Sequence, residues 1–349
     1  MQTLTRRDLL ISVTAAGIGS TLGIGKVGAQ TVDFKGKTIS MVVGYAAGGG
    51  ADLIGRLVAP NLTRLLPGNP VVTVQNMPGA SGGKAMSFVA QKGTNDGTLL
   101  MMGSGSAVDP LNYRTANLPY KPEEFNIVAG FGRGGLALIV NTAALSRLND
   151  TSKPPVTMGA ITAHDVFGRS GLTLWGIECL GWNVKWVIGY AGTNDVLIAL
   201  DRGEVDMAIT GDLNKIRNQV NTGKIKILAL SGPRAEMQDV PQIADQVIDK
   251  IDDPLEKKAF AYWRNYNTLD KWIALPPNTD KAVVAAYRAA CDEMAKDPQF
   301  VQAGKSMSED FIIQTPDQVA ASIKTLAETP DEAINFIKTI AAKQGLSMK

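Results

Sequence analysis

Histidine and cysteine are scarce in this sequence, which has one histidine and two cysteines among 349 residues. Structural zinc takes four such ligands, so a dedicated zinc site is almost excluded, and we expect neither a metal nor a cofactor. Cys179 and Cys291 fall in different predicted domains. A disulfide between them would lock any hinge, so we expect two unpaired thiols.

Long apolar runs and blocks of one charge are also absent. Beyond the first 29 residues no stretch approaches the 18 apolar residues of a membrane span. The 35 basic and 33 acidic residues form no basic block, which makes nucleic acid an unlikely partner. The hydrophobic fraction of 45% excludes wholesale disorder, and the length indicates roughly two domains.

Residues 1–29 are typical of an export signal. Residues 5–10, Thr-Arg-Arg-Asp-Leu-Leu, resemble the twin-arginine motif, and an uncharged stretch follows to Gly25. Small residues end the segment, which predicts cleavage after Ala29. The segment holds three basic residues and one acidic residue, so the mature chain would keep 32 of each. The sequence therefore predicts a periplasmic protein of net charge near zero.

Strand and helix patterns alternate along the mature chain, which is typical of an α/β fold. Short apolar runs predict strands at 38–43, 71–74, 98–102, 136–140, 156–161, 184–188, 205–210, 225–230 and 272–275. Helical spacing predicts helices at 53–66, 84–91, 172–180, 195–202, 280–295 and 316–343. No Gly/Ser-rich linker divides the chain, so we expect it to cross between domains on strands.

Three glycine-rich turns follow strands in the first half, at residues 46–52, 78–83 and 103–106. The first two open helices, whose free N–H groups and dipole favour an anion. Glycine lets a ligand approach the backbone, and serine adds a hydroxyl donor. These turns supply the candidate ligand-binding residues Gly49, Gly50, Ala51, Asp52, Ala80, Ser81, Gly82, Ser104 and Ser106.

Three segments of the second half have similar chemistry. The Gly-Arg-Ser-Gly sequence at 168–171 precedes a predicted helix, and its arginine suits a carboxylate. Residues 189–195 join a strand to a helix, and 210–212 end another strand. The candidate ligand-binding residues here are Arg169, Ser170, Tyr190, Ala191, Gly192, Thr193 and Thr210.

Two familiar motifs are less convincing. Residues 130–135 fit G-x-G-x-x-G but lead into a strand instead of a helix, so a dinucleotide site is rejected. Residues 79–83 fit the nucleophile elbow G-x-S-x-G, with Ser81 as nucleophile. The single histidine, His164, would then be the base, although Pro78 disturbs the elbow. A secreted serine hydrolase using Ser81 and His164 stays the alternative.

Taken in order, several segments resemble the Bug family, the extracytoplasmic solute receptors of tripartite tricarboxylate transporters. The resemblance lies in residues 48–57 (GGGADLIGRL), 76–83 (NMPGASGG), 95–100 (NDGTLL), and 189–192 (GYAG) with 200–206 (LDRGEVD). It extends from about residue 36 to 345. The chain differs where Ala46 and Ala47 replace the usual proline, and in the segment 163–171.

This resemblance implies a two-lobed, type II-like periplasmic binding fold with a ligand cleft between the lobes. Lobe 1 would comprise residues 33–138 and 270–349, and lobe 2 residues 139–269. It also implies a monomeric receptor, not an enzyme, that captures a small carboxylate-type organic anion by hinge closure and delivers it to membrane permease subunits. A ligand sensor that reports to a signalling partner is a further alternative.

Overall fold

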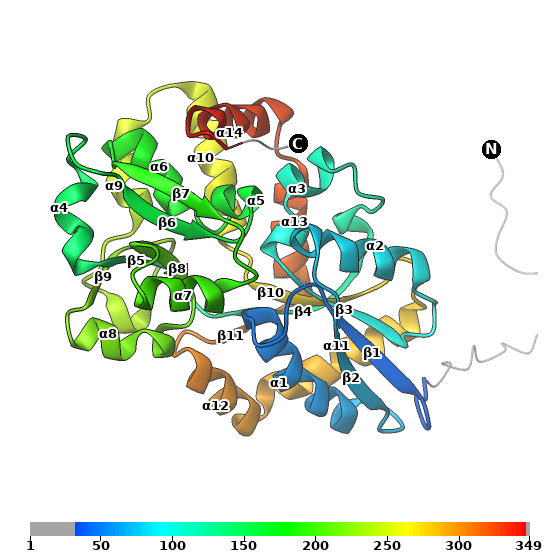
Figure 1. Cartoon of the computed structure of the whole chain (residues 1–349). Coiled ribbons are helices and arrows are strands. Elements are labelled where there is room, and N and C mark those ends of the chain that lie inside the picture. Colours follow the sequence, from blue (N-terminus) through cyan, green and yellow to red (C-terminus); the bar gives the residue numbers. More distant parts are fainter. Residues whose placement is uncertain (1–31, 347–349) are drawn as a thin grey trace, which may run out of the picture. The chain divides into compact units, whose positions relative to one another are not determined.

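The computed structural model describes residues 32–346, which form two β-sheets covered by helices (Figure 1). The predicted α/β fold class with two sheets is confirmed. The predicted signal segment and its cleavage site after Ala29 lie outside the described residues. Within residues 32–346, no helix has both the length and the apolar character needed to cross a membrane.

Six strands form the first sheet, in the order β11-β4-β10-β3-β1-β2. β1 runs parallel to β2 and β3, whereas β10 and β11 are antiparallel to their neighbours. The strands are β1 (Thr38–Val43), β2 (Val71–Asn76), β3 (Leu99–Ser104), β4 (Asn126–Gly132), β10 (Lys271–Leu275) and β11 (Ile312–Gln314).

Helices cover both faces of this sheet. Because side chains alternate along a strand, Met41 and Val43 of β1 join one core while Val42 joins the other. In α1, Ile54, Val58 and Leu62 lie four residues apart and are fully buried. One face carries α1 (Gly50–Leu65), α11 (Lys281–Lys296) and α12 (Pro298–Met307); the other carries α2 (Gly83–Lys92), α3 (Pro110–Thr115) and α13 (Pro316–Ala327).

Five strands form the second sheet, in the order β7-β6-β8-β5-β9, with β5 antiparallel to both neighbours. They are β5 (Ala137–Asn141), β6 (Val156–Ala160), β7 (Val184–Ile188), β8 (Met207–Thr210) and β9 (Ile225–Leu230). The accompanying helices are α4 (Leu145–Leu148), α5 (Ala163–Phe167), α6 (Gly171–Leu180), α7 (Thr193–Asp201), α8 (Arg217–Asn221) and α9 (Ile243–Val247).

The chain passes between the sheets twice. It leaves the first sheet through residues 133–136 and returns through 231–270, which contain α10 (Pro254–Tyr266). β10 then inserts between β3 and β4, so residues far apart in sequence complete one sheet. The predicted boundary after residue 138 falls inside β5, close to the first crossing. The lobe boundaries themselves stay predictions.

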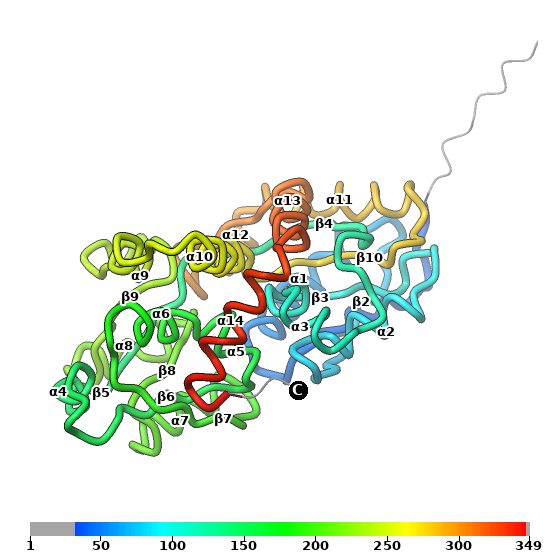
Figure 2. Tube along the Cα trace, turned by 90° about the horizontal axis from the view of Figure 1, so that it is seen from above, coloured from blue at the N-terminus to red at the C-terminus, as the bar shows by residue number. Residues whose placement is uncertain are grey.

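The last helix, α14 (Asp331–Lys343), connects the end of the chain with the second sheet (Figure 2). Its apolar face joins a core that includes α10 and reaches β5 and β6. Beyond its end, the Trp186 Nε1–H of β7 donates to Gln344 Oε1 at 2.9 Å. Residues 331–346, placed by prediction in lobe 1, therefore contact residues of lobe 2.

The sequence did not predict β4, β11, α12 or the short helices α3, α4, α5 and α8. Glycines at 130 and 132 obscure the apolar run of β4. Gly130 is required because a Cβ there would lie 2.4 Å from Val319 of α13. All five tryptophans are buried.

Candidate functional site

A small cleft lies where loops of the two sheets meet. Its volume is about 30 Å³, enough for a few water molecules. It is lined by Gly49, Gly50, Leu53, Arg133, Arg169, Thr193, Asn194, Leu197, Thr210, Gly211, Asp212 and Lys215. An adjoining hollow shares Arg169 and Thr193 and adds Ser170. Six of the predicted site residues thus meet here: Gly49, Gly50, Arg169, Ser170, Thr193 and Thr210.

The start of α1 forms one wall of this cleft. Gly49 is the N-cap residue and provides no side-chain cap, so the first helical N–H groups carry partial positive charge. A Cβ on Gly50 would lie 2.9 Å from an Nη atom of Arg133. Glycine at position 50 therefore makes room for a guanidinium. A cation at a helix N-terminus is unfavourable by itself, and an anion between the two would be stabilised by both.

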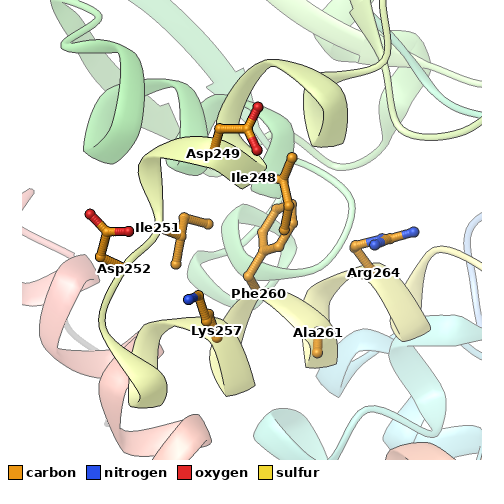
Figure 3. A pocket seen from close by; sticks show the side chains of 8 residues that line it. All are labelled: Ile248, Asp249, Ile251, Asp252, Lys257, Phe260, Ala261 and Arg264. Atoms are coloured by element: carbon orange, nitrogen blue, oxygen red, sulfur yellow. The ribbon is translucent and has the colours of Figure 1, made fainter.

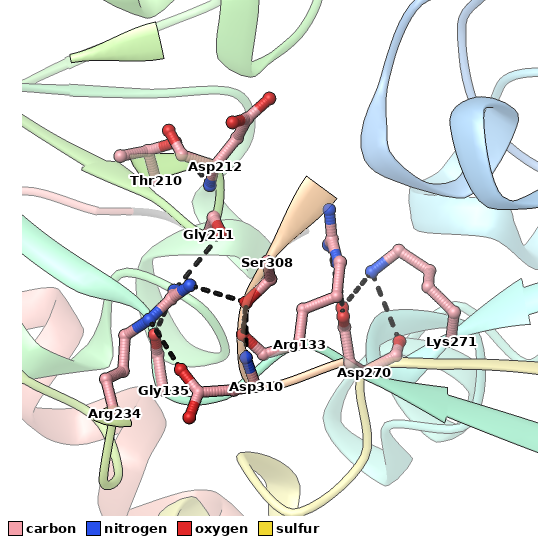
Figure 4. A network of polar contacts seen from close by, with 10 residues as sticks. All are labelled: Arg133, Gly135, Thr210, Gly211, Asp212, Arg234, Asp270, Lys271, Ser308 and Asp310. Carbon is pink, nitrogen blue, oxygen red and sulfur yellow. Dashed lines mark hydrogen bonds and ion pairs between the residues drawn. The ribbon is translucent and has the colours of Figure 1, made fainter. Parts of the chain in front are cut away.

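Arg133 belongs to a buried charge cluster at the first crossing (Figure 4). Its Nε and Nη2 donate to the two carboxylate oxygens of Asp270 at 2.7 and 3.1 Å, and Lys271 Nζ donates to the same carboxylate. Burial, opposed by Asp270 and assisted by Arg133 and Arg169, lowers the pKa of Lys271 to about 8. One carboxylate thus serves two cations, which leaves a surplus positive charge.

A second network holds the backbone of Arg133. The buried Arg234 donates to the carbonyls of Gly135 and Gly211 at 2.9 and 3.2 Å and to Ser308 Oγ at 2.9 Å. The Ser308 hydroxyl in turn donates to the Arg133 carbonyl at 2.8 Å (Figure 4). Arg133 is therefore fixed at both its side chain and its backbone.

Arg169 enters the cleft from the second sheet. Flanking glycines allow this, because a Cβ on Gly168 would lie 2.6 Å from Tyr266 and one on Gly171 2.2 Å from Trp263. Trp263 Nε1–H also donates to the Gly168 carbonyl at 3.2 Å. The loop is thereby anchored on α10. Within residues 32–346 the guanidinium of Arg169 has no hydrogen-bond or ion-pair partner.

A hydrogen bond crosses the cleft from the second sheet to the first. Asn194 Nδ2 donates to the Gly48 carbonyl at 3.2 Å, while Asn194 Oδ1 accepts from Lys215 Nζ at 2.6 Å. The ammonium can only donate, so it fixes which end of the Asn194 amide faces Gly48. This pair joins the two sides of the cleft.

Asp52, a predicted ligand-binding residue, is instead saturated by internal bonds. Its carboxylate accepts from Gly48 N–H at 2.8 Å, Arg56 Nε at 2.9 Å and Asn76 Nδ2 at 2.9 Å. Burial raises its pKa, but these donors, Arg56 first, outweigh burial and lower it overall. Asp52 does not line the cleft and instead holds the glycine-rich turn in shape. Ala51 likewise points into the core.

The turn at 79–82 and the serines of β3 form a separate polar cluster. The Tyr45 hydroxyl accepts from Ser104 Oγ at 2.5 Å, contacts Ser106 Oγ at 2.8 Å and donates to the Ser81 carbonyl at 3.1 Å. Of the predicted site residues, Ala80, Ser81, Gly82, Ser104 and Ser106 belong here and do not line the cleft. A Cβ on Gly44 would lie 3.0 Å from the Gly82 Cα, so this cluster adjoins the end of β1 and the turn before α1.

The remaining second-half candidates lie at the start of α7. Tyr190 is half-buried and packs against the apolar core on that face of the second sheet. Ala191 is exposed, and Gly192 is the N-cap of α7. None of the three lines the cleft. Their ligand-binding role stays a prediction.

The alternative hydrolase site is not assembled. His164 lies in α5, and within residues 32–346 its buried Nε2 has no hydrogen-bond partner, Ser81 included. Burial, with a smaller effect of Lys338 on α14, lowers the pKa of His164.

The two cysteines, Cys179 and Cys291, are both free thiols, as predicted from the sequence.

Another hollow, of about 430 Å³, lies on the surface between residues 248–252 and α10 (Figure 3). Phe260 and Ile251 line it together with acidic and basic side chains, Asp249 and Lys257 among them. It contains no predicted site residue, whereas six predicted site residues meet at the smaller cleft and its adjoining hollow. The smaller cleft between the sheets is therefore the better candidate site.

No family model matches the sequence. A curated relative, the UPF0065 protein in the TAR-I ttuE-ttuC' intergenic region of Agrobacterium vitis, is 25% identical over 227 residues. The match covers 62% of this chain and 62% of the relative, so the chain spans about three fifths of that relative's length.

Two solved structures match almost the whole chain. The periplasmic binding protein BugD has a TM-score of 0.64 at 20% identity, covering 89% of this chain and 99% of BugD. A protein of R. palustris, solved with adipate, has a TM-score of 0.65 at 20% identity, covering 90% and 99%. The chain has the two-lobed fold of the Bug-type periplasmic solute-binding proteins. The predicted resemblance to this family is confirmed.

BugD is described as a periplasmic binding protein. The cleft residues that sequence reasoning missed are Leu53, Arg133, Asn194, Leu197, Gly211, Asp212 and Lys215, and it also missed Asp270 and Lys271 of the charge cluster around Arg133. Two signals could have found some of them. Arg133 follows a glycine-rich strand end, and Asp270 and Lys271 are opposite charges at the start of the apolar β10. Their convergence depends on β10 returning to the first sheet.

Proposed function

We propose that this chain is a periplasmic solute receptor that captures a small carboxylate-type organic anion in the cleft between its two sheets. Lobe 1 would comprise residues 33–138 and 270–349 and lobe 2 residues 139–269. Closure of the lobes on the ligand would shift the population toward the closed state. A tripartite tricarboxylate-type permease would read that state, and a twin-arginine-type signal would export the chain.

The unpartnered guanidinium of Arg169 is the observation that carries this proposal. Arg169 is half-buried at the cleft, and within residues 32–346 no protein group pairs with its guanidinium, so its donors are available to a ligand anion. The surplus charge of the Arg133–Asp270–Lys271 cluster and the uncapped start of α1 add to the same field. A planar carboxylate matches the fork of an arginine side chain.

The neighbours support the same ligand class. One similar fold was solved with adipate, a carboxylate. Each lobe of this chain supplies cleft residues, Gly50 from one and Thr193 from the other, as capture by closure requires.

Thermal-shift scans of the mature protein against mono-, di- and tricarboxylates and aromatic acids test the proposal. A ligand at a hundred times its Kd stabilises by about 2.7 kcal/mol, which raises the Tm by about 5 °C. Arg169→Gln should abolish the shift. Arg202→Gln, which removes an exposed arginine at the end of α7, is the matched control and should retain it. No shift with any acid, or a full shift in Arg169→Gln, would refute the proposal.

A further inference from the structure

One carboxylate lies among the cations of the cleft. Asp212 follows β8 and lines the cleft together with three cations, Arg133, Arg169 and Lys215. Its side chain is 25% exposed, so a ligand in the cleft can reach it. An acid at this place opposes the binding of a ligand that carries only carboxylates, because like charges repel each other strongly where water is excluded. Attraction of carboxylates alone therefore does not explain the composition of the cleft.

The backbone around Asp212 is held from the protein interior. The Asp212 N–H donates to Thr210 Oγ1 at 3.0 Å, and Arg234 donates to the Gly211 carbonyl at 3.2 Å. Thr210 and Arg234 are both buried. Thr210, which was predicted to bind the ligand, thus uses its hydroxyl to hold residue 212. The place of the Asp212 backbone is set before any ligand enters.

The carboxylate of Asp212 has acceptor sites to spare. It points away from the network around Arg234 (Figure 4), and among residues 32–346 neither of its oxygens accepts a hydrogen bond. Lys215 Nζ lies 3.7 Å from Asp212 Oδ2, which is an ion pair without a hydrogen bond, while the same ammonium donates to Asn194 Oδ1 at 2.6 Å. An ionised carboxylate can accept about four hydrogen bonds, so Asp212 can accept from a ligand.

The neighbouring carboxylates are used inside the protein. Asp270 is bound by two cations of its cluster. Asp165, which lines the adjoining hollow, accepts from the Ile161 N–H at 3.3 Å and from Ser170 Oγ at 3.4 Å. Of the acids that line the cleft or the hollow within residues 32–346, Asp212 alone has two oxygens without a hydrogen-bond donor.

We propose that Asp212 selects anions that carry an ammonium group beside their carboxylates, so that the cleft takes amino-dicarboxylates. This inference rests on the proposed function. One carboxylate of the ligand pairs with Arg169, the other meets the surplus charge beside Arg133, and the ammonium donates to Asp212. A ligand without the ammonium leaves the Asp212 charge unpaired when the lobes close, and its binding is weakened accordingly.

Ligands that differ only by the ammonium test this inference. Succinate and aspartate share a four-carbon chain, and glutarate and glutamate share a five-carbon chain. Calorimetric titration of the mature protein at pH 7 gives the Kd of each. In each pair that binds, the amino acid should bind about tenfold more tightly than the plain dicarboxylate.

Asp212→Asn keeps the shape of the side chain and removes its charge. Aspartate should bind this variant about tenfold more weakly, and succinate as tightly as before or more tightly, because the repulsion is gone. A carboxylate that merely supports Lys215 would instead weaken both ligands equally when it is removed. Asp239→Asn, at an exposed acid that does not line the cleft, is the matched control and should keep the wild-type preference. Melting temperatures without ligand verify that both variants are folded.

Malate separates the ammonium charge from hydrogen bonding, because its hydroxyl donates without a charge. It should bind the wild type more weakly than aspartate does, and equal binding would overturn the assignment of an ammonium. Equal affinity of the wild type for succinate and aspartate, or an unchanged preference in Asp212→Asn, would overturn the role of Asp212 and leave the proposed function standing. If the wild type binds none of these acids, both proposals fail.

Discussion

The two glycine-rich turns of the first sheet have similar sequences and different structures. In the turn before α1, Gly50 leaves space for the guanidinium of Arg133, and Asp52 holds the Gly48 N–H. In the turn before α2, Ala80 and Ser81 are forced into positive φ and are held by Tyr45 and Asn112. In the first turn, glycine leaves room for a neighbouring side chain. In the second turn, Gly79 and Gly82 adopt positive φ, which glycine does at little cost. Glycine content alone therefore does not reveal how a turn binds a ligand.

Substitution at Gly50 should have the largest effect on binding. A Cβ there displaces the Arg133 guanidinium from the start of α1. Gly50→Ala should weaken carboxylate binding by about 100-fold, or about 2.7 kcal/mol, because a fixed buried charge is lost from the cleft. Calorimetric titration measures this. Gly232→Ala, where a Cβ finds no atom closer than 3.8 Å, is the control. Equal affinity of both variants would contradict the role of Arg133.

Asp52 should stabilise its turn without contacting the ligand. Asp52→Asn loses charge-assisted bonds to Gly48 and Arg56 and should lower the free energy of unfolding by about 2 kcal/mol in urea titrations. The pKa of Asp52 is depressed in the folded protein, so its contribution is present above the unfolded value of 3.8 and is lost as pH falls through the folded pKa. The variant should lose less stability in that acid range. An unchanged free energy of unfolding would show that these bonds contribute nothing.

The charge cluster of Arg133, Asp270 and Lys271 beside the cleft should make binding sensitive to pH. Lys271, with a pKa of about 8, loses its charge as pH rises, so affinity for an anion should fall by up to about tenfold between pH 7 and 9.5. Lys271→Arg should remove this dependence because arginine stays charged. Ser81→Ala, in the other turn, should keep the wild-type profile. A profile that is flat in the wild type would be evidence against a charged Lys271 in the site.

The bond from Asn194 to Gly48 should have the smallest effect. Asn194→Ala removes one hydrogen bond across the cleft, worth about 1 kcal/mol, and should weaken binding by about fivefold. Faster dissociation, measured by stopped flow, should account for most of the loss. Asn221→Ala, at the end of α8 and away from the cleft, is the control. If dissociation is unchanged, the bond does not hold the closed cleft together.

Local sequence patterns were sufficient for most elements. The predicted strands at 38–43 and 225–230 coincide with β1 and β9, because short runs dominated by apolar residues carry a strong strand signal. β11 has only three residues and exists because it pairs with β4. α12 escaped prediction although Asp297 caps it and Pro298 begins it.

The candidate site was predictable only in part. Turns at strand ends and one arginine before a helix pointed to Gly49, Gly50, Arg169, Ser170, Thr193 and Thr210, all of which lie at the cleft or its adjoining hollow. Asp52, Ser104 and Ser106 could also hydrogen-bond to a ligand. In the structure, however, the Asp52 carboxylate accepts from Arg56, and the two serine hydroxyls contact the Tyr45 hydroxyl. Which polar groups remain free depends on neighbours that are distant in sequence.

The sequence by itself determined the alternation of strands and helices, the glycine-rich turns and the resemblance to the Bug family, since these depend on neighbouring residues. Only the tertiary structure decided that Arg133, Asp270 and Lys271 share one buried cluster and that Arg169 has no partner among residues 32–346. The physical reason is the return of β10 between β3 and β4, which places residue 270 beside residue 133. Electrostatic fields depend on distance in space, and periodicity along the chain does not encode that distance.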